Sequence, residues 1–121
     1  MNLSFHRSPS CLIVRMSGEL DLSSAALFRD KVEDELARTG APNLIVNLEA
    51  LDFVDSTGLG AIFGRHRQVT QGGGKMFLTA VPPKVQSMLE MAGLSSVLLF
   101  ARTDEDALSM LSQRHKGGAV R

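Results

Sequence analysis

The feature that most limits the folds open to this chain is the alternation of short apolar runs with longer segments of helical spacing. Five segments have the length and composition of strands, and they cover residues 3–7, 11–16, 44–48, 76–79 and 97–100. A short turn joins the first two, and a helix follows the second strand and each later one, which gives the order ββαβαβαβα. Such alternation is typical of a largely parallel sheet with right-handed crossovers. The sequence therefore predicts an α/β fold with one mixed, mostly parallel sheet and helices packed around it.

The predicted helices have apolar residues at intervals of three and four, the spacing of a helix that packs one face on a core. These positions are Ala25, Phe28, Val32 and Leu36, then Leu59, Ile62 and Val69, then Val85, Met88 and Leu89, and finally Ala107, Leu108 and Leu111. We expect Asp21 or Ser23 to cap the first helix, and Thr103 with Asp106 to form a capping box at the last. Residues 113–121 are polar and contain glycine, so we expect a single domain over residues 1–112 and a frayed tail.

The segment Asp55-Ser56-Thr57-Gly58-Leu59-Gly60 joins the most apolar strand to the second helix. Ser56 at such a place is a natural N-cap, and this is the simplest interpretation of the residue. The free amides and the dipole of a helix N-terminus would also tolerate a phosphate there. Glycine weakens a helix by roughly 1 kcal/mol per residue, so the presence of Gly58, Gly60 and Gly64 in this helix calls for a structural or functional explanation. Tight packing on the sheet and close approach of a partner both remain open.

The topology places several polar residues together. In open α/β sheets the loops that follow parallel strands lie at one edge and carry the site. Those loops are residues 18–22, 51–57 and 80–83. We therefore expect one shared surface for Asp21, Asp52, Asp55, Ser56 and Thr57.

The composition argues against several classes of function. The chain has 121 residues and a formal net charge of zero, so nothing favours binding to nucleic acid or to an anionic membrane. No apolar run approaches the length of a transmembrane helix. Cys11 is the only cysteine, which excludes an internal disulfide and fits a cytoplasmic protein. The cysteine and three scattered histidines have no metal-binding spacing, so we expect neither a metal nor a cofactor.

Two enzymatic interpretations fail on the residues themselves. The segment Gly72-Gly73-Gly74-Lys75 is not a phosphate-binding loop, because Val69 stands where a glycine is needed and Met76 where a hydroxyl residue is needed. A serine hydrolase needs a base near Ser56. His66 lies ten residues later, about 15 Å along an intact helix. We therefore expect that the chain has no catalytic residue and is not an enzyme.

The chain resembles the anti-sigma factor antagonists, which are bacterial anti-anti-sigma proteins built on a STAS domain. The resemblance covers about residues 3–111. It is carried by Gly18-Glu19-Leu20-Asp21, Asn47-Leu48, Phe53-Val54-Asp55-Ser56-Thr57-Gly58-Leu59-Gly60, Gly72-Gly73, Pro82-Pro83 and Met91-Ala92-Gly93-Leu94. The Asp-Ser-Thr-Gly-Leu-Gly block is the most specific part, since STAS domains of transporters and sensor assemblies often vary there.

The resemblance implies a switch in which Ser56 is the phosphoacceptor. The unphosphorylated protein binds an anti-sigma factor that is also a serine kinase and so frees the sigma factor; phosphorylation releases the kinase. A phosphatase of the PP2C type restores the serine. The partner-binding residues expected on this basis are Asp21, Asp55, Ser56, Thr57, Gly58, Leu59 and Gly60. Two alternatives remain, a STAS-type regulatory or scaffold protein of a sensor assembly and a small nucleotide-binding α/β protein.

Overall fold

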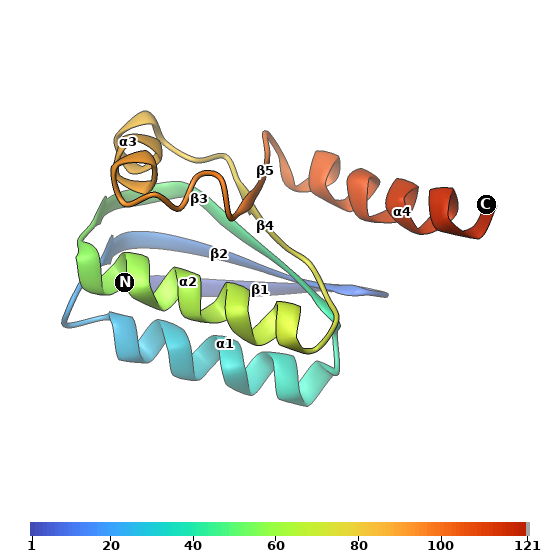
Figure 1. Cartoon of the computed structure of the whole chain (residues 1–121). Coiled ribbons are helices and arrows are strands. Elements are labelled where there is room, and N and C mark those ends of the chain that lie inside the picture. The colour runs from blue at the N-terminus through green and yellow to red at the C-terminus, as the bar shows by residue number, and fades with distance from the viewer. Residues whose placement is uncertain (121) are drawn as a thin grey trace.

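The computed structural model describes residues 1–120, with side chains described through Ser112, and its elements follow the predicted order (Figure 1). The strands are β1 (Asn2–Ser8), β2 (Cys11–Leu20), β3 (Asn43–Val54), β4 (Met76–Thr79) and β5 (Leu99–Ala101), and the helices are α1 (Ala25–Thr39), α2 (Ser56–Gln71), α3 (Pro83–Met91) and α4 (Asp104–Val120). The expected frayed tail, residues 113–121, lies outside the described side chains. It stays a prediction, as does the domain boundary at residue 112.

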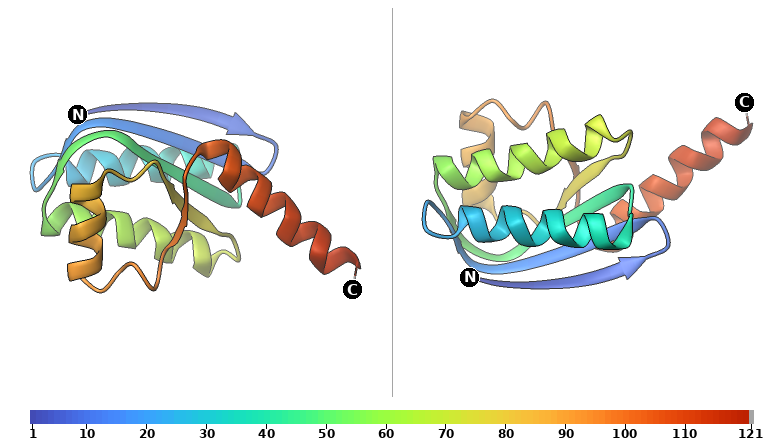
Figure 2. Two further views of the ribbon diagram at one scale, coloured as in Figure 1. Left: turned by 90° about the horizontal axis from the view of Figure 1, so that it is seen from above. Right: turned by 90° about the horizontal axis from the view of Figure 1, so that it is seen from below.

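The strands form a single sheet in the order β1-β2-β3-β4-β5. β1 is antiparallel to β2, and the other neighbours are parallel, so the predicted mixed sheet is confirmed. Helices α1, α2 and α3 cover one face, and α4 lies on the other (Figures 1 and 2). The larger core is on the first face and includes Phe28, Ile62 and Leu89. A smaller core joins Ala107 of α4 to the second face.

The strand β3 is longer than predicted and runs to the turn that precedes α2. Its register against β2 shifts twice, between Arg15 and Ser17 and between Gly18 and Glu19 of β2. Each shift adds a residue to β3, as a β-bulge does. In the last part of β3 the buried positions are therefore Leu48, Leu51 and Val54, spaced by three. The end of the strand could not be recognised from the sequence, because a regular strand buries every second residue and this part buries every third.

A buried carboxylate attaches the start of α4 to the second face of the sheet. Asp104 is only 4% exposed. It accepts hydrogen bonds from Thr79 Oγ1 at 2.6 Å, from Asn47 Nδ2 at 3.0 Å and from Arg15 Nη2 at 2.9 Å. Burial alone would raise the pKa of Asp104, but the hydrogen bonds from Thr79, Arg15 and Asn47 and the charge of Arg15 together lower it. A charged carboxylate is therefore satisfied here by donors from β2, β3 and β4.

Candidate functional site

The second helix begins at Ser56, but the residue that caps it is Asp55. Oδ1 of Asp55 accepts a hydrogen bond from the amide of Gly58 at 2.9 Å. The expectation that Ser56 is the N-cap was therefore wrong, because the neighbouring carboxylate occupies that position one residue earlier. Ser56 is exposed as the first residue of the helix, and Thr57 beside it is also exposed. The hydroxyl of Ser56 is consequently not used to cap the helix.

The second oxygen of Asp55 joins this turn to the loop between β2 and α1. Oδ2 accepts a hydrogen bond from the amide of Leu22 at 3.2 Å. The amide of Asp55 in turn donates to the carbonyl of Leu20, also at 3.2 Å. Residues far apart in the sequence thus meet at the carboxyl edge of the sheet. This confirms the expectation that the loops after β2 and β3 share a surface.

The Asp21 carboxylate organises the loop before α1. Its Oδ1 accepts from the amide and hydroxyl of Ser23 at 3.0 and 2.7 Å and from the amide of Ser24 at 3.2 Å. These bonds, that of the Ser23 hydroxyl first, lower the pKa of Asp21 and keep it ionised. The N-cap of α1 is Ser24, without a side-chain capping bond, and not Asp21 or Ser23 as expected. Asp21 therefore shapes the turn that leads into the helix.

The glycines of the turn have two different environments. A Cβ on Gly58 would lie 2.2 Å from the carbonyl oxygen of Leu20, whereas one on Gly60 or Gly64 would meet no heavy atom within 4 Å. Tight packing therefore explains Gly58, while the other two face open space. Leu59 is buried in the core. Gly58 and Leu59 thus lie beneath the surface that we expected them to form.

The site also contains exposed apolar residues that the sequence reasoning missed. Leu22 is 78% exposed at the loop held by Asp55, and Phe53, two residues before Asp55, is 47% exposed. The signal for Leu22 was present in the sequence, since it is a single leucine between the polar residues Asp21 and Ser23. Apolar side chains on an otherwise acidic, hydrogen-bonded surface are typical of protein contacts.

Within residues 1–112, no hydrogen bond joins Ser56 to a base of the kind a hydrolase needs. His66 is half-buried on α2, where its ring stacks on Phe63 with centroids 5.8 Å apart. Burial lowers the pKa of His66. Among the described residues, no three histidine, cysteine, aspartate or glutamate side chains are grouped to hold a metal ion. Within the same part of the chain, no helix has the length and apolar character needed to cross a membrane.

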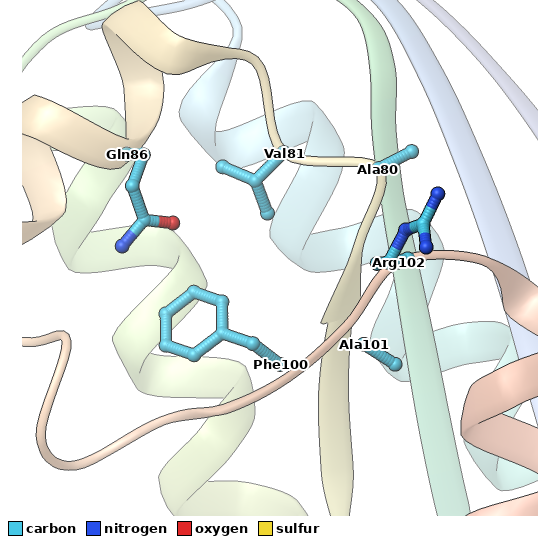
Figure 3. A pocket seen from close by; sticks show the side chains of 6 residues that line it. All are labelled: Ala80, Val81, Gln86, Phe100, Ala101 and Arg102. Carbon is cyan, nitrogen blue, oxygen red and sulfur yellow. The ribbon is translucent and has the colours of Figure 1, made fainter.

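A cavity of about 450 Å³ lies between the β4–α3 connection and β5, apart from the Ser56 turn. Its lining residues are Ala80, Val81, Gln86, Phe100, Ala101 and Arg102. Figure 3 shows the Val81 and Phe100 side chains beside Gln86, while the guanidinium of Arg102 points away from the Phe100 ring. Because Arg102 is the one ionisable residue among the six, this cavity lacks the paired acid and base of a hydrolytic site.

Comparison with known proteins agrees with this picture of the fold. The family model described as STAS domain matches residues 2–107. An anti-sigma F factor antagonist of Paenibacillus polymyxa is 34% identical over 111 residues, which are 92% of this chain and 93% of the relative. That relative is named for antagonism of a regulator and not for a reaction, in agreement with the expectation that the chain is not an enzyme.

The solved structures that are similar in fold include two antagonists of this kind. The first is an anti-sigma factor antagonist from Mycobacterium paratuberculosis, with a TM-score of 0.81, 22% identity and coverage of 92% of this chain and 93% of the other. The second is the Bacillus cell fate determinant SpoIIAA in its phosphorylated form, with a TM-score of 0.70, 25% identity and coverage of 90% and 98%.

Proposed function

Because the chain belongs to the STAS domain family, among the anti-sigma factor antagonists, we propose that it frees a sigma factor by binding the anti-sigma factor. In this proposal the anti-sigma factor is also a serine kinase, and phosphorylation of Ser56 releases it. A PP2C-type phosphatase then restores the serine, and the cycle takes place in the cytoplasm. The observation that carries the proposal is the position of Ser56, which is exposed at the start of α2 while Asp55 provides the cap.

The local structure suits a residue that changes its charge. The first amides of a helix have no partner within the helix. Asp55 takes the amide of Gly58, which leaves the amides of Ser56 and Thr57 in the first turn for an anion. A phosphate there would also be favoured by the helix dipole. The free protein can therefore hold the modified residue without a change of fold.

Although the fold should tolerate the phosphate, binding of the partner at this surface should be weakened by it. Phosphorylation adds about −1.5 to −2 charges at neutral pH, next to the carboxylates of Asp55 and Asp21. A partner surface fitted to a neutral serine would meet added bulk and a desolvation cost. We propose that this surface consists of Asp21, Asp55, Ser56, Thr57 and Gly60. The open space around Gly60 supports a close approach of the partner at this point.

The proposal is tested with the purified anti-sigma factor kinase of the source organism and ATP. Wild type, Ser56→Ala and Thr57→Ala are incubated with the kinase, and phosphate is located by peptide mass mapping. Calorimetry then measures the affinity of each form for the kinase. We expect phosphate on Ser56, none on Ser56→Ala, and strong binding by Ser56→Ala. Ser56→Asp should bind more weakly, although one carboxylate carries less charge than a phosphate.

Three results would contradict this proposal. Phosphate on Thr57 of the wild type would refute the assignment of the acceptor. Equal affinity of the kinase for phosphorylated and unphosphorylated protein would leave the acceptor correct and refute the switch. If the wild type neither binds the kinase nor accepts phosphate, a role of the same fold in a sensor assembly becomes the better proposal.

A further inference from the structure

We infer that Leu22 is the apolar anchor of the partner surface and inserts into an apolar pocket of the anti-sigma factor that basic side chains surround. This inference rests on the proposed function and adds a residue and a partner chemistry to it. Leu22 lies at the tip of the loop between β2 and α1, with 78% of its surface exposed.

The loop around Leu22 is already ordered in the free protein. The amide of Leu22 is bound by Asp55, and the next two amides are bound by Asp21. The hydroxyl of Ser24 donates to the carbonyl of Glu19 at 2.7 Å. These bonds fix the backbone while they leave the Leu22 side chain in solvent. Binding through such a residue avoids most of the entropy cost of ordering a loop.

Leu22 is held beside the turn that carries the proposed phosphoacceptor. The carboxylate that holds Leu22 belongs to Asp55, the residue directly before Ser56. A kinase that admits the Ser56 hydroxyl to its active site must also cover the residues around it. Phe53, 47% exposed at the same edge of the sheet, would supply a second apolar contact. An apolar centre with a charged rim is the usual composition of a specific interface.

Three aspartates lie at the edge of the sheet that carries Leu22. Asp21 precedes Leu22 directly, and its lowered pKa keeps it ionised. Asp55 is bound to the loop, and Asp52 is exposed on the last part of β3. Complementary potentials are typical of paired protein surfaces. The pocket that receives Leu22 is therefore expected to carry arginine or lysine at its rim.

The test measures binding of the purified anti-sigma factor kinase to wild type, Leu22→Ala, Leu22→Asp and Met110→Ala by calorimetry. Met110 is the matched control, because it is an exposed apolar residue on α4, on the opposite face of the sheet. Leu22→Ala should raise the Kd at least about tenfold, and Leu22→Asp should raise it further. Met110→Ala should bind like the wild type. All four proteins should melt at similar temperatures, since the altered side chains are exposed.

Kinetics and salt provide independent readouts. Leu22→Ala should raise the KM for phosphorylation of Ser56 and leave kcat unchanged, because the anchor contributes equally to ground-state and transition-state binding. The affinity of the wild type should fall as salt concentration increases. Affinity that is independent of salt would contradict the basic rim.

The outcomes separate this inference from the proposed function. If the wild type binds and is phosphorylated but Leu22→Ala binds equally well, the anchor is refuted and the switch stands. If the wild type itself neither binds nor is phosphorylated, the proposed function has failed. If sedimentation shows that the wild type self-associates and Leu22→Ala does not, the residue contacts a second copy of the chain, which also overturns the inference.

Discussion

Gly58 and Gly60, two residues apart on α2, should respond to the same substitution with opposite changes in stability. In Gly58→Ala the new Cβ would lie 2.2 Å from the Leu20 carbonyl oxygen and 2.8 Å from a methyl group of Val54. The helix must therefore move by about 1 Å to regain ordinary contact. Overpacking of this kind costs about 1–3 kcal/mol, and disturbing the Asp55 cap about 0.5–2 kcal/mol. The better helix propensity of alanine offsets about 1 kcal/mol of this loss in unfolding free energy.

The net expectation for Gly58→Ala is a loss of about 2 kcal/mol of unfolding free energy. Gly60→Ala meets no neighbouring atom within 4 Å, so it should gain up to about 1 kcal/mol from helix propensity alone. Urea denaturation of both variants measures these values directly. Thermal melting should show a decrease of about 8 °C for the first and an increase of about 4 °C for the second.

Binding of the anti-sigma factor kinase gives the same pair a functional readout. Gly60→Ala should be more stable than the wild type and yet bind the kinase more weakly, because the methyl group occupies the space where the partner approaches. Gly64→Ala, one turn further from Ser56 and also in open space, is the matched control and should gain stability without losing affinity. A Gly58→Ala variant as stable as the wild type would refute the packing argument. Unchanged affinity in Gly60→Ala would remove that glycine from the interface.

Three further predictions concern stability. Ser56→Ala should change the unfolding free energy by less than about 0.5 kcal/mol because Asp55 provides the cap; a loss above about 1 kcal/mol in urea would show that Ser56 shares it. Asp104→Ala should lower the unfolding free energy by about 3 kcal/mol, chiefly because the hydrogen bonds from the buried Thr79 and from Asn47 are lost. The bond from Arg15, which is 59% exposed, should contribute little. A loss below about 1 kcal/mol in the same denaturation assay would contradict this. The pKa of Asp104 is lowered in the folded state, so the ionised carboxylate stabilises the protein fully at pH values above the ordinary carboxyl pKa of about 3.9. This stabilisation is lost as the pH falls through the pKa of the folded state. Wild type should therefore lose more stability than Asp104→Asn between pH 5 and pH 2 or so, and parallel pH profiles would refute the assignment.

The order of elements could be predicted from the sequence because apolar periodicity is a local property. The end of β3 could not, because two bulges changed the spacing of its buried residues from two to three. The choice between Asp55 and Ser56 as N-cap also escaped prediction. Both residue types are good caps, and the contact that distinguishes them, from the amide of Leu22, comes from another loop.

Polar contacts between residues far apart in the sequence also limited the prediction at the start of α4. Thr103 Oγ1 accepts a hydrogen bond from the amide of Asp106 at 3.0 Å, which is the Thr103 half of the capping box that the sequence predicted. The neighbouring Asp104 was not predicted to be buried, since its partners lie on three different strands. Topology alone predicted that the loops after β2 and β3 meet at one edge of the sheet, as their hydrogen bonds show. Which residues of the candidate surface face solvent depended on packing, as the burial of Gly58 and Leu59 shows.

The agreement between strand order in space and strand order along the chain has a consequence for biosynthesis. Each strand that leaves the ribosome finds its neighbour already present, so the sheet can grow from one edge in the direction of translation. The Asp104 carboxylate leaves the ribosome after all three of its hydrogen-bond donors, which are Arg15, Asn47 and Thr79. A nascent chain halted before α4 would therefore hold a nearly complete sheet with these polar side chains still open, and the arrival of the final helix would mark the end of folding.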